Sequence, residues 1–319
     1  MDTLKHNTVQ SLSPAGIDTL IMGEFAPDLS ALIAKKKDLQ TRLCQQGALL
    51  FRGFQINTPE QFKRLATIFT NEFMDDNGEH IPLSGVDGVF TPVGFSANEK
   101  LLWHNENSFN QTWPLMIMFG AAKVAEIGGE TPIADSRKVL DAIDPEVRKE
   151  FYQKGIMYVR THGFGFGRTW QETYRVENQK ALEIKLRHNN IQFEWYAKDQ
   201  LVTKQIRSAL IKHPITNEAA WFAQPQHWHP YCLKPEVRAS LLSLFPEDRL
   251  PRNCYFGDGS IIPDTMMQHI LNAYKKVEIS FPWETGDVMV LDNVLFAHAR
   301  NPYSGKRKLF VTMGTSVSF

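Results

Sequence analysis

The stretch LLWHNENSF at residues 101–109 contains the triplet His104-Asn105-Glu106, and the stretch GDVMVLDNVLFAH at residues 286–298 ends in His298. Two imidazoles and one carboxylate hold non-haem Fe(II) on one face and leave three coordination positions open. Residues two apart in an extended segment point to the same side, so His104 and Glu106 can reach one ion. Residues 286–298 predict a turn followed by a buried strand that carries the third ligand.

An H-x-E triplet alone is a weak signal, because it occurs by chance in many chains of this length. The competing interpretation is a surface loop with two unrelated polar residues. Further segments in the same order argue against it. They are residues 47–54, 113–122, 127–135, 191–195, 250–253, 255–260 and 299–309.

Together these segments resemble the iron(II)- and 2-oxoglutarate-dependent oxygenases of the taurine dioxygenase type, from about Gly47 to the C-terminus. The resemblance is strongest to the branch that hydroxylates amino acids in peptide antibiotic pathways, such as the syringomycin-type aspartyl hydroxylase. Clavaminate synthase is a more distant relative that also has Glu where most of the family has Asp. Position 106 therefore keeps its carboxylate, which disfavours halogenation and leaves hydroxylation or desaturation.

The resemblance implies a role for each matching residue. His104, Glu106 and His298 match the iron ligands, and Arg307 and Thr131 match the residues that bind the distal carboxylate of 2-oxoglutarate. A buried carboxylate needs a planar, bidentate cation, which Arg supplies better than Lys. A hydroxyl group can bind one further lone pair. Fe(II) is then the cofactor, and 2-oxoglutarate and dioxygen are co-substrates.

Arg307 is flanked by Lys306 and Lys308, so a solvated basic turn is the alternative for this residue. Alternation argues against that alternative. In a strand over residues 307–313, Arg307 shares a face with three apolar residues, and an apolar face points inward. We therefore expect Arg307 to enter the core while both lysines face water.

Strands and helices alternate in the sequence. The pattern predicts helices over residues 28–44, 58–69, 135–143, 144–154, 234–245 and 263–274, and strands over 48–51, 115–124, 156–160, 191–195 and 219–222. Such alternation can indicate a parallel doubly wound sheet, but no glycine-rich strand-to-helix turn for a dinucleotide is present. The resemblance implies instead a mainly β fold with surrounding helices, built on a double-stranded β-helix (a cupin-like jelly roll). It also implies one domain over residues 1–319, with a helical insertion at roughly 140–275 that shapes the substrate side.

The resemblance implies hydroxylation of an unactivated C–H bond of an amino acid, either free or carried on a peptidyl carrier protein, in specialised metabolism. A desaturase or cyclase on the same scaffold and an inactive small-molecule-binding jelly roll are the alternatives. Five residues are candidates for substrate contact, with ordinary loop polarity as the competing interpretation: Asn105, Asn107, Ser108, Arg168 and Arg300.

Two further clusters have chemistry-bearing residues. Residues 226–230 (QHWHP) repeat the two-apart histidine spacing, but no carboxylate or thiolate lies close upstream, which favours a structural or substrate-side role over a second metal site. Residues 162–168 (HGFGFGR) lack the spacing of a phosphate-binding loop. They predict a surface loop or a lid that closes over substrate.

The global composition excludes several classes of function. Lys plus Arg and Asp plus Glu number 35 each, so no electrostatic attraction to nucleic acid or an anionic membrane is expected. Cys44, Cys232 and Cys254 form no metal-binding or redox motif, which is typical of a reducing cytoplasm. Residues 1–6 have no apolar signal-peptide core, and no apolar stretch reaches membrane-spanning length. These features predict a soluble cytoplasmic protein.

Overall fold

A computed structural model describes residues 17–74, 80–92, 94–165 and 167–318. The chain divides into two compact units. The first contains residues up to 101, together with 114–135 and 278–317, and the second contains 102–113 and 136–277. The expected single domain with an insertion at roughly 140–275 stays a prediction.

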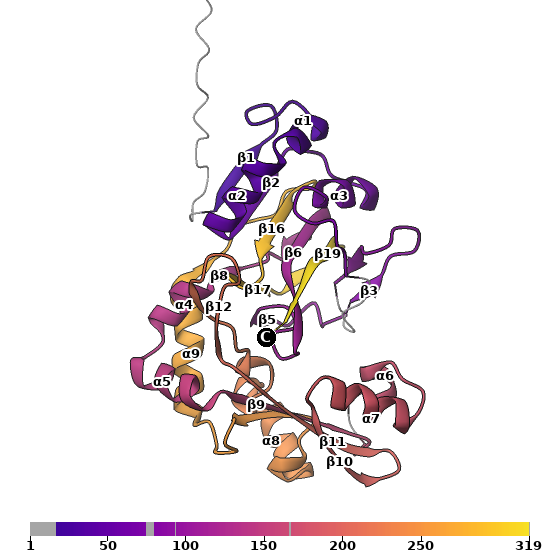
Figure 1. Cartoon of the computed structure of the whole chain (residues 1–319), viewed down its shortest axis with the longest axis vertical. Coiled ribbons are helices and arrows are strands. Elements are labelled where there is room, and N and C mark those ends of the chain that lie inside the picture. The colour runs from indigo at the N-terminus through magenta and orange to yellow at the C-terminus, as the bar shows by residue number, and fades with distance from the viewer. Residues whose placement is uncertain (1–16, 75–79, 93, 166, 319) are drawn as a thin grey trace, which may run out of the picture. The chain divides into compact units, whose positions relative to one another are not determined.

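A seven-stranded sheet forms the centre of the first unit, and β16, β6 and β19 lie side by side in it (Figure 1). In spatial order its strands are β1 (Asp18–Ile21), β2 (Ala48–Arg52), β16 (Val288–Asp292), β6 (Thr112–Lys123), β19 (Lys308–Ser318), β4 (Phe90–Thr91) and β3 (Ile81–Pro82). Strand β1 runs parallel to β2, whereas β16 runs antiparallel to both β2 and β6. This antiparallel pairing excludes a doubly wound parallel sheet.

Smaller sheets contain the remaining strands of this part of the fold. One has the order β15 (Glu278–Ile279), β8 (Ile133–Asp135), β17 (Phe296–Arg300) and β5 (Leu101–His104), and the other pairs β18 (Tyr303–Ser304) with β7 (Ile127–Gly128). In the four-stranded sheet, β8 runs antiparallel to both β15 and β17.

Both faces of the seven-stranded sheet are buried, as alternate residues of β16 show. Val288 and Val290 belong to a cluster formed with the helices, whereas Met289 and Leu291 belong to a cluster shared with Ile133 of β8. One face is therefore covered by helices and the other by the four-stranded sheet. Two face-to-face sheets around one apolar core confirm the jelly-roll architecture with surrounding helices.

Three helices supply the helical side of this core: α1 (Leu29–Ala34), α2 (Lys36–Gln46) and α3 (Pro59–Ala66). Helix α3 begins with a capping box in which the Thr58 side chain accepts from the Gln61 backbone amide and the Gln61 side chain accepts from Thr58. Phe62 of this helix contacts β6 at Gly120, where a Cβ atom would lie 2.7 Å from the Phe62 ring. Gly120 therefore allows the helix to approach the sheet closely.

The second unit has its own sheets, one with the order β10 (Gln192–Ala197), β11 (Gln200–Arg207), β9 (Ile156–His162) and β14 (Arg252–Phe256), and one that pairs β12 (Leu210–Lys212) with β13 (Ala219–Trp221). Its helices are α4 (Ser136–Ala142), α5 (Pro145–Lys154), α6 (Trp170–Tyr174), α7 (Gln179–His188), α8 (Pro235–Leu244) and α9 (Asp264–Val277), with short 3-10 turns at Pro225–His227, Pro230–Cys232 and Glu247–Arg249. Trp170, Leu182 and Leu186 pack on Leu201, which fixes α6 and α7 to β11.

Most of the predicted elements are present, but two predictions were wrong in form. The single helix predicted over residues 28–44 is two helices, α1 and α2, that meet at Lys35. The single strand predicted within residues 286–298 is also two strands, β16 and β17, which belong to different sheets. The Asp292 side chain accepts hydrogen bonds from the amides of Val294 and Leu295, and this turn carries the chain from one sheet to the other.

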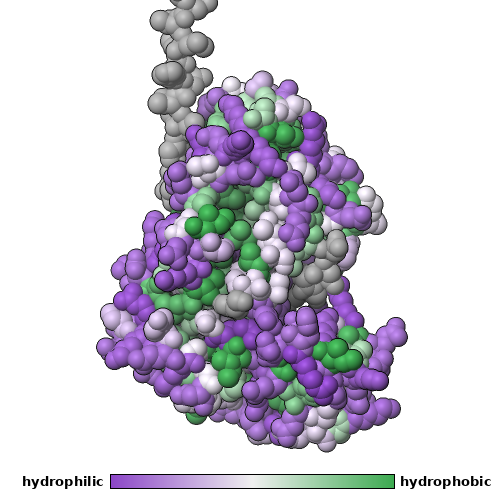
Figure 2. Space-filling view, viewed as in Figure 1, coloured by the Kyte–Doolittle hydropathy of each residue, from purple (hydrophilic) through white to green (hydrophobic). Residues whose placement is uncertain are grey.

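Within the described residues, no helix combines the length and the apolar composition needed to cross a bilayer. On the face drawn in Figure 2, hydrophobic residues (green) gather in separate patches among hydrophilic ones (purple). Residues 1–6, in which the sequence predicts no signal peptide, lie outside the described residues.

Candidate active site

The proposed ligands meet on the four-stranded sheet. His104 is the last residue of β5, and His298 lies in β17, the neighbouring strand. His104 Nε2 lies 3.9 Å from Glu106 Oε2, and one ligand atom from each of His104, Glu106 and His298 lies within 4.8 Å of the others. These three side chains can hold a metal ion. Among the described residues, no other group of three His, Cys, Asp or Glu meets this criterion.

Glu106 reaches the site from a turn. Strand β5 ends at His104, and Asn107 has a φ of +58°, a left-handed conformation that Asn adopts more readily than most residues. The amide of Ser108 donates to the carbonyl oxygen of Asn105 at 3.2 Å and closes the turn. The extended segment predicted for residues 104–106 is therefore wrong at Glu106, although the carboxylate is buried beside His104.

His104 has a fixed ring orientation. Its Nδ1 lies 2.9 Å from the carbonyl oxygen of Leu102, so that Nε2 faces Glu106. The His227 ring packs against the His104 ring with 4.7 Å between centroids, and His227 Nε2 lies 2.8 Å from the same Leu102 oxygen. Burial, and then the nearby His104, lower the pKa of His227 to about 3. A neutral His227 thus supports His104 without adding charge.

The predicted structural role for residues 226–230 agrees with these contacts. His229 Nε2 lies 3.0 Å from the carbonyl oxygen of Ile262, and its Nδ1 accepts from the amide of Tyr231. Gln226 donates its side-chain amide to the carbonyl oxygen of Trp103 in β5. This segment therefore fixes the strand that ends at His104.

Arg307 is half-buried immediately before β19, whereas Lys306 and Lys308 are exposed, as predicted. Its Nε donates to the carbonyl oxygen of Gly129 at 3.0 Å, and its Nη2 donates to Thr131 Oγ1 at 3.4 Å. Trp283 Nε1 also donates to Thr131 Oγ1, at 3.1 Å. The sequence interpretation missed Trp283, which lies 15 residues before His298 and has no motif around it.

The surroundings of Arg307 fit the carboxylate of a keto acid. Burial lowers the pKa of Arg307 to about 10, which means that its charge is incompletely compensated. No carboxylate among the described residues forms an ion pair with it within 4 Å. A bidentate carboxylate would supply the missing charge, and the Thr131 hydroxyl lies beside it.

The candidate substrate contacts differ in placement. Asn105, Asn107 and Ser108 are buried, and Asn105 donates to Ser136 Oγ at 3.2 Å. Asn107 Oδ1 and Ser108 Oγ are buried without a hydrogen-bond partner among the described residues. Arg168 is exposed in the glycine-rich segment. Arg300 donates to the carbonyl oxygens of residues 95, 96 and 99, so its guanidinium holds that loop.

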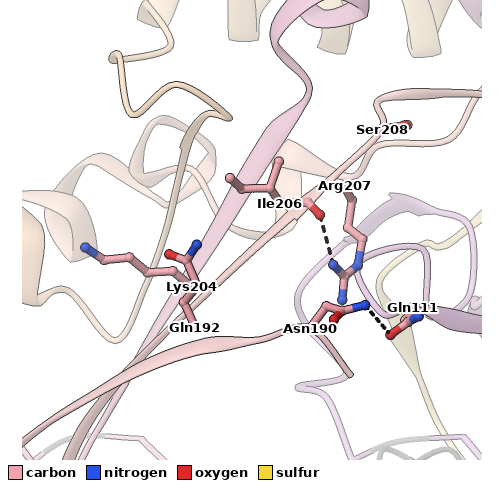
Figure 3. Close-up of a pocket in the computed structure, with 7 residues that line it drawn as sticks. All are labelled: Gln111, Asn190, Gln192, Lys204, Ile206, Arg207 and Ser208. Atoms are coloured by element: carbon pink, nitrogen blue, oxygen red, sulfur yellow. Dashed lines mark hydrogen bonds between the residues drawn. The ribbon is translucent and has the colours of Figure 1, made fainter. Parts of the chain in front are cut away.

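A separate hollow of about 320 Å³ lies in the second unit. Figure 3 shows its lining, which comes from β10, β11, the residues next to these strands and the segment after Glu106: Gln111, Asn190, Gln192, Lys204, Ile206, Arg207 and Ser208. Its residues are mostly polar, and none of them is one of the predicted site residues.

The chain matches the family described as Taurine catabolism dioxygenase TauD, TfdA family over residues 14–313. The chain belongs to this family. It is therefore an Fe(II)- and 2-oxoglutarate-dependent dioxygenase, an oxidoreductase, with Fe(II) as cofactor and 2-oxoglutarate and dioxygen as co-substrates. This confirms the family, the enzyme class and the cofactors predicted from the sequence.

Two relatives and one solved structure illustrate the similarity of this TauD-family chain to known proteins. It is 40% identical over 272 residues to the dapdiamide synthesis protein DdaC of Enterobacter agglomerans, covering 85% of this chain and 83% of the relative. It is 25% identical over 291 residues to a clavaminate synthase-like protein of Arabidopsis thaliana, covering 88% of this chain and 84% of the relative. The structure of AAD-2 in complex with Mn(II) and N-oxalylglycine has the same fold, with a TM-score of 0.55 and 14% sequence identity. The match covers 96% of this chain and 98% of the AAD-2 chain.

Proposed function

We propose that this TauD-family enzyme hydroxylates an unactivated C–H bond of an amino acid, free or bound to a carrier protein, in the synthesis of a specialised metabolite. The observation that carries the proposal is the convergence of His104, Glu106 and His298 in a chain 40% identical to a dapdiamide synthesis protein. The resemblance to the amino-acid hydroxylases of antibiotic pathways supports the choice of substrate.

We assign His104, Glu106 and His298 as the iron ligands. Two imidazoles and a carboxylate bind one face of Fe(II) and leave positions for a co-substrate and dioxygen. When bound, iron supplies the oxidation chemistry that couples decarboxylation of 2-oxoglutarate to attack on a C–H bond. The carbonyl oxygen of Leu102 fixes the His104 ring, and the buried His227 packs against it, so the protein presents Nε2 in one orientation.

Arg307 and Thr131 are assigned to the distal carboxylate of 2-oxoglutarate. Arg307 supplies the positive charge, and Gly129 and Thr131 hold its guanidinium in place. The indole N–H of Trp283 donates to the Thr131 oxygen and fixes its position. These residues position the co-substrate, and none needs to act as a general base.

The substrate is expected to contact the turn that carries Glu106. Asn107 Oδ1 and Ser108 Oγ are buried polar atoms without a partner among the described residues, and such atoms cost free energy unless a ligand or water binds them. We assign Asn107 and Ser108 to substrate contact, with Asn105 as a weaker candidate. Arg168 stays a candidate only as part of a lid over residues 162–168, in which Phe166 lies outside the described residues. Arg300 holds a loop instead.

A desaturase or cyclase on the same scaffold is the second candidate, because the ligand set serves hydrogen abstraction in either reaction. An inactive small-molecule-binding protein is less favoured, because His104, Glu106, His298, Arg307 and Thr131 are all present. A carrier protein as partner and a cytoplasmic location complete the proposal; three cysteines with no disulfide between them accord with a reducing compartment.

Anaerobic titration with Fe(II) and then 2-oxoglutarate tests the proposal. We expect a weak visible charge-transfer band that requires both additions and is absent from Glu106→Ala. Amino acids and their carrier-bound thioesters are then screened for a change in that band and, after oxygen is admitted, for product mass. Addition of one oxygen atom supports hydroxylation, and loss of two hydrogens supports desaturation or cyclisation. A band with no responding amino acid would reject the proposed substrate.

A further inference from the structure

Arg160 has an unusual environment. It lies half-buried in β9, and its guanidinium carbon is 5.0 Å from the centroid of the Trp228 ring and 5.8 Å from that of Phe109. Its Nε and Nη2 are buried, and neither has a hydrogen-bond partner among the described residues. No carboxylate among those residues forms an ion pair with it. Buried N–H groups without a hydrogen-bond partner cost free energy unless a ligand binds them.

A second arginine, Arg252, lies close to the same Trp228 ring. Arg252 of β14 is the direct register partner of Arg160, so the two side chains leave the sheet on the same face. The Arg252 guanidinium carbon lies 5.4 Å from the centroid of the same Trp228 ring. Like charges directly opposite each other destabilise a sheet. Arg252 is exposed and its charge is solvated, so Arg160, with its two buried nitrogens, is the residue that an anion would compensate, with Arg252 close enough to assist.

The walls of this site are connected to the iron ligands through the chain. Phe109 follows Glu106 by three residues, and Trp228 directly follows His227, whose ring packs on His104. The Phe109 and Trp228 rings pack edge to face, with 5.3 Å between their centroids. Asn107 and Ser108, with their buried polar atoms, lie between Glu106 and Phe109. A substrate that contacts this turn is thus placed beside Arg160.

We propose that Arg160, assisted by Arg252, binds an anionic head group of the substrate against the Trp228 and Phe109 rings. A planar guanidinium stacked on an aromatic ring keeps its edge free for bidentate oxyanion binding. The anion has two possible sources: the carboxylate of a free amino acid, or the phosphate of a carrier protein's pantetheine arm. The identification of this anion as part of the substrate rests on the proposed function.

The hollow of about 320 Å³ in the second unit is a weaker candidate for an anion-binding site. Gln192, Lys204 and Ile206, which line the hollow in Figure 3, lie on the opposite face of the sheet from Arg160, because Arg160 pairs with Thr203 and side chains alternate along β11. Arg207 in that hollow donates to the backbone oxygens of Ile206 and Asn189 and to Gln205. Its Nη1 and Nη2 are therefore already used, whereas its Nε has no partner among the described residues.

Saturation-transfer NMR tests the proposal on protein loaded with Zn(II) and 2-oxoglutarate, so that no turnover is needed. The probes are the twenty proteinogenic L-amino acids and pantetheine 4′-phosphate, together with the amino-acid α-amides, which lack the α-carboxylate, and pantetheine, which lacks the phosphate. Wild type is compared with Arg160→Gln and Arg160→Lys. Arg187→Gln is the matched control, because Arg187 also lies over an aromatic ring, that of Phe193, but is ion-paired to Glu183.

We expect an anionic probe to bind wild type and Arg187→Gln and to bind Arg160→Gln at least about tenfold more weakly. Arg160→Lys should lie between them, and the analogues that lack the carboxylate or the phosphate should not distinguish the variants. A response to an amino acid identifies a carboxylate, and a response to pantetheine phosphate alone identifies the carrier arm. Equal binding by wild type and both Arg160 variants, or no binding of any anion to wild type, would overturn the proposal.

The unfolding temperature gives a second measurement that needs no ligand. Arg160→Met should unfold at the same or a higher temperature than wild type, because it removes two buried N–H groups that have no hydrogen-bond partner among the described residues and keeps an apolar stem against the rings. A clear fall in that temperature would show that Arg160 has a structural role and would overturn the proposal. Anion binding through Arg160 in a protein that gives no iron–2-oxoglutarate band would leave this site standing and reject the proposed function.

Discussion

Arg307 donates a hydrogen bond from Nη2 to Thr131 Oγ1 across 3.4 Å, and so joins the start of β19 to the segment just before β8. Gly129 lies under the arginine stem, where a Cβ atom would be 3.1 Å from Arg307 Cδ. Its φ of +78° also favours glycine. The close approach of Gly129 and the hydroxyl of Thr131 thus fix the guanidinium before any ligand binds, and such preorganisation reduces the entropy cost of binding.

Arg307→Gln should weaken binding of 2-oxoglutarate by about 2 kcal/mol, or about thirtyfold, because it removes a charge-assisted partner for a carboxylate. Arg307→Lys should restore only part of this loss, since it keeps the charge without the bidentate geometry. The dissociation constant is measured from the visible band under anaerobic conditions. Lys306→Gln, which changes the exposed neighbour, is the control, and equal losses in both variants would contradict the assignment.

Glu106→Gln should fold but should hold iron weakly, because it replaces a buried carboxylate with a neutral amide of nearly the same shape. Metal content after dialysis and the rise in unfolding temperature on adding Fe(II) are the measurements. Wild type should gain stability with metal, and the variant should not. A variant that keeps stoichiometric iron would show that Glu106 is not a ligand.

The sequence predicted the chemistry of the site better than its geometry. His104, Glu106 and His298 lie together as expected. They could be identified in the sequence from their residue types and from the segments around them. The spacing rule for an extended strand did not apply at Glu106, since the strand ends at His104 and Glu106 lies in a turn that contains the left-handed Asn107. Such a backbone conformation has no clear signal in one sequence.

Arg160 and Trp283 were missed for a different reason. Arg160 lies in a strand that the sequence predicted correctly, but its partners Trp228 and Arg252 come from segments more than 60 residues away. The split of residues 286–298 into β16 and β17 was missed because both strands are fully buried and the residues on either side of Asp292 and Asn293 are apolar. Only the pairing of strands, which is set by long-range packing, shows that the two belong to different sheets.

Stability should fall when the pH is lowered from about 6.5 to about 4. Burial lowers the pKa of His162 from 6.5 to about 4, and Arg160 and Arg252 act in the same direction. Between these values the unfolded chain binds a proton that the folded protein does not, so the free energy of unfolding rises with pH by up to about 1.4 kcal/mol per unit for this group. His227 and His229, whose pKa values burial also lowers, add to the slope.

Urea unfolding of wild type and His162→Gln at pH 7, 6 and 5 measures this contribution. We expect the variant to lose less stability than wild type on acidification, while the two stability curves run parallel above pH 7. Equal slopes in both proteins between pH 6 and 5 would show that the folded protein protonates His162 normally.

Arg52→Met should destabilise the first unit by about 3–5 kcal/mol, because it leaves a buried carboxylate without its cation. Arg52 donates to both oxygens of Asp287, at 3.1 and 2.7 Å, and Asp287 is fully buried. Burial raises the pKa of Asp287 more than Arg52 lowers it, so its charge is already costly with the partner present. The pair also ties β2 to the turn that precedes β16, the strand that leads to His298.

Urea unfolding at pH 7 measures this loss, and Arg64→Met serves as the control because the Arg64 side chain donates an exposed hydrogen bond to Ser30. The control should stay within about 0.5 kcal/mol of wild type. Adding Asp287→Asn to Arg52→Met should recover part of the loss, since a neutral amide is less costly to bury than an unpaired carboxylate. If Arg52→Met loses less than about 1 kcal/mol, the Arg52–Asp287 pair contributes no more than an ordinary surface ion pair. That result would contradict the proposed cost of leaving a buried carboxylate unpaired.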